Sequence, residues 1–192
     1  MSILELDFVG PYSFQDSNLS VFKAPCASSA GVYLHTIKQQ NDGSHLIHYI
    51  GETTSLAKRH REHLTNTLGL NYGIFDYKKA QVGILELVWP GLWRDRTPEG
   101  PSRQIKAYHV VHDSVIKYLS VLNIFFAEVD TDRALRKHIE GCIGWNLRNK
   151  HPELKALYPD DNRVGVMEDK NHGLLRIRTT EKILGLDTEI PY

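Results

Sequence analysis

The stretch SSAGVYLHTIKQQNDGSHLIHYIGETTSLAKRHREHL, residues 28–64, contains two apolar runs and a basic, histidine-rich tail. Both runs, GVYLHTI (31–37) and HLIHYIG (45–51), are rich in β-branched and aromatic residues, and an Asn-Asp-Gly cluster lies between them. This composition predicts two strands joined as a hairpin. Behind the Thr-Thr-Ser cluster that follows, the apolar spacing becomes helical, which predicts a helix over residues 54–67.

The rest of the chain contains further runs with strand or helix periodicity. Residues 1–27 are rich in turn formers and are expected to be an irregular lead-in with one short element at most. The downstream pattern predicts strands over 80–89 and 122–130, helices over 104–119 and 132–149, a strand ending near Thr179 and a last helical turn stopped by Gly185. The alternation of strands and helices within 192 residues indicates one α+β domain.

Composition limits the class of protein. The 23 basic and 23 acidic residues cancel, so any surface that attracts a polyanion must come from local clustering. No apolar run is long enough to cross a membrane, and the two cysteines, Cys26 and Cys142, are too few for a disulfide framework. We therefore expect a cytoplasmic protein whose cysteines are core residues.

Several short motifs fit one known pattern. GVY (31–33) and YIG (49–51) lie on neighbouring predicted strands, Arg59 follows eight residues after the second motif, and His63 follows four residues later. Together with Glu140 on the helix after a later strand, this set resembles the GIY-YIG nuclease superfamily. The resemblance implies a small central antiparallel sheet flanked by helices. It also implies a single domain over 1–192, with an N-terminal lead-in, an insertion at about 75–121 and a C-terminal extension.

The resemblance implies a catalytic role for each of these residues. Tyr33 would activate the attacking water, Arg59 would steady the phosphate, and Tyr49 and His63 would support them. Glu140 would hold a divalent cation, Mg²⁺ or Mn²⁺. Arg59 and His63 stand one helical turn apart and so project from the same face, as such a site requires. The function expected is a metal-dependent DNA endonuclease, of restriction, repair or mobile-element type.

Simpler interpretations of the same residues exist. Tyrosines are common on half-buried strands, and Arg136 or Lys137 could pair with Glu140 on an ordinary helix surface. Glu52, directly after YIG, would repel a phosphate unless a cation neutralises it. These points favour an alternative function, a nucleic-acid-binding module that does not cleave; an RNA nuclease is a further alternative.

Other residues are candidates for contacts outside the catalytic set. The candidates for nucleic-acid contact, with DNA as the expected partner, are Lys58, Arg61, Arg94, Arg96, Arg136 and Asn162. Asn149 competes with Asn162 as the asparagine that the family often carries. The pairs His60–His63 and His109–His112 have helical spacing but no third ligand nearby, so zinc is disfavoured. A homo-oligomer is compatible with this interpretation, and no membrane contact is expected.

The predicted hairpin leads to one structural prediction about the two tyrosines. Side chains alternate along a strand, so Tyr33 and Tyr49 share a face only if the register has the right parity. A two-residue turn at Asp42-Gly43 would put the tyrosines on opposite faces. A three-residue turn, or a bulge in either strand, would put them on the same face. If both tyrosines serve one site, the second arrangement must hold.

Overall fold

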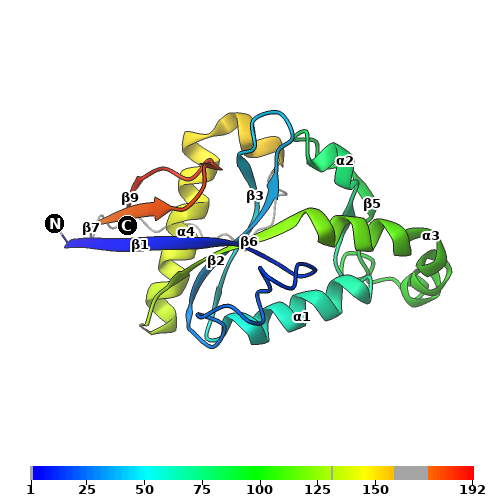
Figure 1. Cartoon of the computed structure of the whole chain (residues 1–192). Helices are drawn as coiled ribbons and strands as arrows, with labels where there is room; N and C mark the ends of the chain where they lie inside the picture. The colour runs from blue at the N-terminus through cyan, green and yellow to red at the C-terminus, as the bar shows by residue number, and fades with distance from the viewer. Residues whose placement is uncertain (1, 131, 158–172) are drawn as a thin grey trace.

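A computed structural model describes residues 2–130, 132–157 and 173–192 of the chain (Figure 1). No described helix is long and apolar enough to cross a membrane. The helices are α1 (Leu56–Leu68), α2 (Tyr77–Ala80), α3 (Gly100–Val121), α4 (Arg133–Lys150) and a 3₁₀ turn at Pro152–Leu157. The strands are β1 (Ser2–Ser13), β2 (Gly31–Lys38), β3 (His45–Thr53), β4 (Ile74–Phe75), β5 (Leu87–Trp89), β6 (Leu122–Glu128), β7 (Gly173–Thr179), β8 (Ile183–Leu184) and β9 (Glu189–Pro191).

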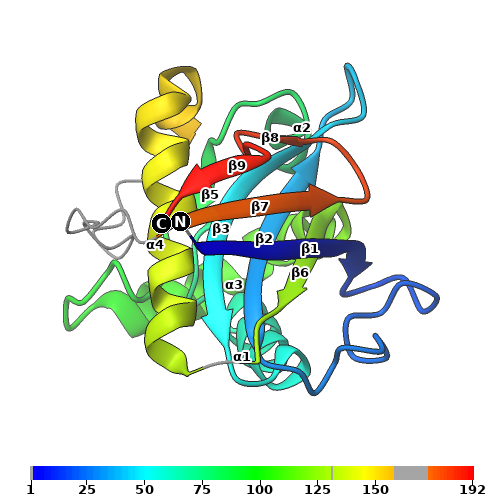
Figure 2. The same cartoon turned by 90° about the vertical axis from the view of Figure 1, so that its left-hand side faces the viewer.

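The described strands form one large mixed sheet and one small pair. Seven of them lie in the order β8-β3-β2-β6-β1-β7-β9, and the sheet curls into a half-barrel (Figure 2). β1 runs parallel to β7, and β3 runs parallel to β8. The expectation of a small central antiparallel sheet flanked by helices is therefore wrong: β1, β6, β2 and β3 form an antiparallel portion, parallel pairings to β7 and β8 extend it on both sides, and β9 pairs antiparallel with β7.

The largest error concerns residues 2–13, which form a 12-residue strand, whereas residues 14–27 are irregular as expected. Leu6 and Phe8 face the core while Glu5 and Asp7 face solvent, which is the alternation of a half-buried strand. Pro11 lies where the register of β1 against β6 shifts, between Val9 and Tyr12. An irregular position of this kind tolerates proline, which lacks the N–H that a regular ladder needs.

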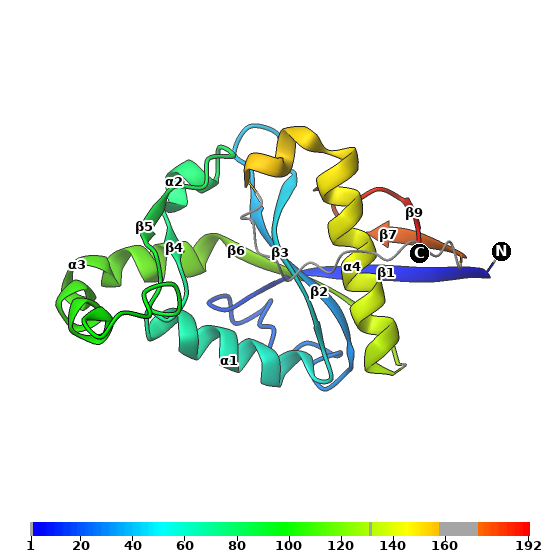
Figure 3. The ribbon, with the colours of Figure 1, turned by 180° about the vertical axis from the view of Figure 1, so that it is seen from behind.

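The central hairpin and the helices beside it agree with the sequence prediction. β2 is buried on both faces along its whole length except at Lys38. On one face, α4 packs Ile139, Cys142 and Ile143 onto the sheet, and on the other α1 and α3 cover it (Figure 3). Cys26 is buried as well, so both cysteines are core residues as predicted.

Residues 69–121, which include the whole of the expected insertion at about 75–121, form a lobe at one end of the sheet (Figure 3). The prediction of a strand over 80–89 is wrong, because α2 ends at Ala80 and the chain turns at Gly83, where φ is +81°. Only Leu87–Trp89 is extended. An apolar run with a left-handed glycine in it cannot continue as a regular strand.

Of the two elements predicted near the C-terminus, the structure contains one. The strand ending at Thr179 is confirmed as β7, which pairs with β1. The prediction of a last helical turn is wrong. Ile183 and Leu184 form the short strand β8 beside β3, and the chain then turns at Gly185, where φ is +81°. A short apolar segment like this one is compatible with a helical turn or with a strand. It forms a strand here because it can pair with the edge of the sheet.

Candidate active site

A bulge in the hairpin brings the two motif tyrosines onto one face. Lys38 pairs with His45, which leaves a six-residue loop over 39–44, and His48 is then an extra residue between two registers. Beyond it, Tyr33 lies opposite Gly51 and His35 lies opposite Tyr49. The rings of Tyr33 and Tyr49 are stacked with centroids 6.0 Å apart. The prediction of a shared face is confirmed, through the bulge and not through a three-residue turn.

Contacts explain why each motif contains glycine. A Cβ on Gly51 would lie 2.4 Å from the Tyr33 Cζ and hydroxyl oxygen, because the ring of Tyr33 lies across this position. A Cβ on Gly31 would lie 2.1 Å from the carbonyl oxygen of Ala127 on β6. Both distances are far below van der Waals contact, so glycine is needed at Gly51 to seat the tyrosine and at Gly31 to pair the strands.

We expect Gly51→Ala to lower the free energy of unfolding by roughly 1–3 kcal/mol, as overpacking a buried site does. Tyr33 is fully buried and its ring packs against Tyr49 and His63, so the ring cannot move without displacing these neighbours. Urea denaturation of the two proteins measures the difference. Thr54→Ala is the control, because Thr54 is exposed just past the same strand; equal stability of all three proteins would contradict the packing described here.

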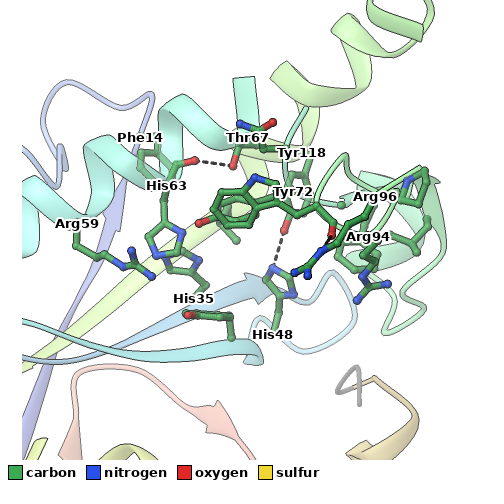
Figure 4. A pocket seen from close by; sticks show the side chains of 18 residues that line it. Phe14, His35, His48, Arg59, His63, Thr67, Tyr72, Arg94, Arg96 and Tyr118 are labelled. Atoms are coloured by element: carbon green, nitrogen blue, oxygen red, sulfur yellow. Dashed lines mark hydrogen bonds between the residues drawn. The ribbon is translucent and has the colours of Figure 1, made fainter. Parts of the chain in front are cut away.

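The hydroxyl of Tyr33, on β2, forms hydrogen bonds with two side chains of α1. His63 Nε2 lies 2.7 Å from this hydroxyl oxygen, and Arg59 Nε donates to it at 3.2 Å. Arg59 and His63 lie side by side below α1 in Figure 4. Arg59 also donates to Glu62 at 3.0 Å. The i,i+4 spacing on the helix, together with the face of Tyr33, therefore produces a connected group at the edge of the sheet.

Burial sets the protonation of this group. Burial raises the pKa of Tyr33 well above its usual value, with Tyr49 adding to the rise, and this outweighs the lowering by Arg59. Burial also lowers the pKa of His63 well below its usual value. Tyr33 is therefore neutral and His63 is a neutral base, so the hydroxyl donates to His63 Nε2 while it accepts from Arg59.

Two further histidines, His35 and His60, pack against the ring of Tyr33, a role that was not predicted from the sequence. His60 Nδ1 donates to the carbonyl oxygen of Leu56 at 2.8 Å, so its Nε2 is free to accept from His35 Nε2 at 3.0 Å. His35 follows Tyr33 by two residues on the same strand face, which is the signal that sequence offered. Both ring nitrogens of His60 are therefore used in hydrogen bonds within the protein.

We expect the buried histidines to make the protein less stable as the pH falls from 7 to 5. Burial lowers the pKa of His60 to about 4, whereas an unfolded histidine titrates near pH 6.5. Between these values the unfolded chain binds more protons, so acid favours unfolding, by about 2 kcal/mol from His60. Urea denaturation at both pH values measures this, and His60→Gln should flatten the dependence. His112→Gln, at an exposed position, is the control; an unchanged slope for His60→Gln would contradict the assignment.

A cleft of about 390 Å³ lies in front of Tyr33 and holds most of the predicted catalytic residues. Tyr33, Tyr49, Arg59 and Glu140 all line it, and His63 lies behind the Tyr33 hydroxyl. These residues come from β2, β3, α1 and α4. The structure thus brings the five predicted residues together around one point.

Glu140 and the neighbouring Glu52 are held differently. Glu140 lies 3.0 Å from Lys137, and burial raises its pKa against the opposing effect of that lysine. Glu52 accepts from Arg133 at 3.1 Å and from Arg136 at 3.3 Å. Its charge is therefore neutralised within the protein, so Glu52 adds little repulsion toward a phosphate in the cleft.

The other predicted contacts fall in several places. Lys58 lines the cleft, and Arg94 and Arg96 line a larger neighbouring cavity. Arg61 lies on the exposed side of α1, 5.9 Å from the centre of the Phe22 ring. Arg136 is only 4% exposed and paired with Glu52, so its guanidinium is not available to a phosphate.

Of the two asparagine candidates, Asn149 does not line the cleft. Asn149 donates to the carbonyl oxygen of Trp145 on the exposed side of α4, and Asn162 lies outside the described residues. Within the described ranges, no group of three or more histidine, cysteine or acidic side chains is arranged to hold a metal. A cation in the cleft would thus rest on Glu140 together with water and substrate oxygens, a donor set that suits Mg²⁺.

Comparison with known proteins adds no relative: no protein-family model, no curated protein and no solved structure matches this chain.

Proposed function

We propose that this protein is a metal-dependent endonuclease that hydrolyses phosphodiester bonds in DNA. One observation carries the proposal: a guanidinium and a neutral imidazole meet at one tyrosine hydroxyl beside a cleft bordered by a carboxylate. Phosphodiester hydrolysis requires a stabilised phosphate, a proton acceptor for water and a cation for the leaving oxygen. Arg59, the Tyr33–His63 pair and Glu140 supply these functions.

The cations of the cleft would hold the scissile phosphate. Arg59 keeps its charge at any working pH and presents several N–H donors, which suits a phosphate oxygen. Lys58 lies one residue away and also lines the cleft. Because Glu62 binds only one nitrogen of Arg59, other donors of the guanidinium remain for the substrate.

The proton of the attacking water would leave through Tyr33. The hydroxyl oxygen of Tyr33 takes the water proton while its own proton passes to Nε2 of the neutral His63. The resulting hydroxide attacks phosphorus, the bond to the leaving oxygen breaks, and that oxygen takes a proton from solvent. Arg59 Nε–H stabilises any negative charge that develops on the tyrosine oxygen during this relay.

Glu140 would hold the divalent cation. Its carboxylate borders the cleft on the side of α4, facing the tyrosines, and Lys137 neutralises it in the protein alone. Mg²⁺ bound there would neutralise charge that develops on the leaving oxygen. Lys137 is about half exposed and can turn toward solvent when Glu140 binds a cation.

Nicking of supercoiled plasmid by the purified protein tests the proposal. We expect open-circular product with Mg²⁺ or Mn²⁺ and none with a chelator. A single-stranded and a duplex RNA of matched length, assayed in parallel, separate a DNA nuclease from an RNA nuclease. Failure to cleave any of these substrates with either metal would refute the nuclease function.

The burial of Tyr33 favours a second candidate, a nucleic-acid-binding module without cleavage. The Tyr33 side chain has no exposed surface, so water reaches its hydroxyl only if the cleft opens. In such a module Arg59 and Lys58 would hold a phosphate without further chemistry. Binding of DNA without nicking, under every metal condition, would establish this alternative.

A further inference from the structure

A second cavity, of about 850 Å³, lies beside the cleft and is lined largely by rings. Its aromatic side chains are Phe14, Tyr49, Tyr72, Phe75, Trp93 and Tyr118. Arg59 and His63 lie at one end, and Arg94 and Arg96 lie at the other (Figure 4). A cavity of this size with mixed rings and cations is suited to a flat, polar ligand that carries negative charge.

The cavity and the cleft share two residues. Tyr49 and Arg59 line both, so a ligand in the cavity lies next to the site proposed for the scissile phosphate. Tyr72 lies between His63, near the end of the cavity that adjoins the cleft, and Trp93, near the end that holds Arg94 and Arg96. Its ring centre is 5.6 Å from that of His63 and 4.9 Å from that of Trp93. Tyr72 is half buried, and Trp93 is exposed.

His48, the bulge residue of the hairpin, lines the cavity and has a buried ring nitrogen without a hydrogen-bond partner among the described residues. This nitrogen is Nδ1, whereas Nε2 lies 2.6 Å from the hydroxyl of Tyr118. Burial lowers the pKa of His48 to about 4, so the ring is neutral, and if Tyr118 donates to Nε2 the ring carries its proton on Nδ1. A buried N–H without an acceptor is costly, so a ligand that brings an acceptor gains binding there.

We propose that this cavity receives a single nucleobase turned out of the DNA stack beside the scissile phosphate. The rings of Tyr49 and Tyr72 offer stacking surfaces, and His48 Nδ1–H donates to a ring nitrogen or carbonyl oxygen of the base. Arg94 and Arg96, both exposed, contact phosphates of the strand outside the cavity. The inference rests on the proposed nuclease function, because the phosphate in the cleft places the base.

A coupling experiment tests the base pocket. DNA duplexes span the nick site mapped with plasmid, and Ca²⁺ replaces Mg²⁺ to prevent cleavage. Each nucleotide that flanks the scissile bond is replaced in turn by an abasic one, and affinity is measured for the wild type and for Tyr72→Ala. We expect Tyr72→Ala to bind the intact duplex roughly 5- to 100-fold more weakly. At one position, removal of the base should abolish this difference.

Controls separate the possible outcomes. Tyr108→Ala removes a tyrosine that is exposed on α3 and lines neither cavity, so it should bind like the wild type. Tyr72→Leu keeps the side-chain bulk if Tyr72→Ala fails to fold, with the same expected loss. Nicking by the wild type with no coupling at any position overturns the base pocket alone. Absence of nicking and of DNA binding overturns the proposed function, and the base pocket with it.

Discussion

Replacing Arg59 by alanine is expected to lower the rate of plasmid nicking by roughly 100- to 1,000-fold, the effect of removing one preorganised donor from a charged transition state. Arg59 acts twice in the site, because its Nε–H donates to the Tyr33 oxygen and its other nitrogens face the cleft. Arg59→Lys keeps the charge but not the planar set of donors, so we expect it to recover only part of the rate.

A surface arginine provides the matched control. Arg178 on β7 is exposed and pairs with Glu5, away from the cleft. Arg178→Ala should nick at the wild-type rate, whereas Arg59→Ala should lose rate while keeping a normal urea denaturation curve. If Arg59→Ala nicks as fast as Arg178→Ala, Arg59 has no part in catalysis.

Replacing Glu140 by glutamine is expected to lower nicking about 100-fold or more and to leave the protein as stable as before or more stable. A bound cation contributes several kcal/mol to the transition state, and each 1.4 kcal/mol is tenfold in rate. Because burial raises the pKa of Glu140, its ionised form costs stability at neutral pH, and a neutral amide avoids that cost. Lost activity with retained stability is typical of a functional carboxylate.

Nicking rates and denaturation curves together test this prediction. Glu86→Gln is the control, because Glu86 is exposed, pairs with Lys79 and lines neither cavity. Higher Mg²⁺ concentrations should restore part of the activity of Glu140→Gln if the residue binds the cation. A variant that is destabilised but fully active would show that Glu140 is structural, paired with Lys137.

The central part of the fold could be predicted because its signals are local. The hairpin and the helices at 56–68 and 133–150 follow from side-chain periodicity within short segments. The sheet as a whole could not, because β1 pairs with β6 and β7, and its partners are more than a hundred residues away. A strand recognised alone gives no information on how many neighbours it will have.

The helix at 100–121 shows the same limit on one face of an element. Ile105, Tyr108, Val115 and Leu119 have the spacing of one apolar stripe, yet Ile105 is 72% exposed and Val115 only 2%. The spacing identifies a face, but burial requires another element to cover it. The buried side chains are concentrated in the second half of this helix, nearest the sheet.

For the candidate site, local spacing already put Arg59 and His63 on one helix face and Tyr33 and Tyr49 on neighbouring strands. Their meeting depends on His48, since the extra residue shifts the register and turns Tyr49 toward Tyr33. The protonation of Tyr33 and His63 depends on burial by segments far along the chain. Local sequence patterns thus predict which side chains share a face of a helix or strand. Register, burial and pKa follow from long-range packing, because they depend on which distant segments pair with a strand or displace water from a side chain.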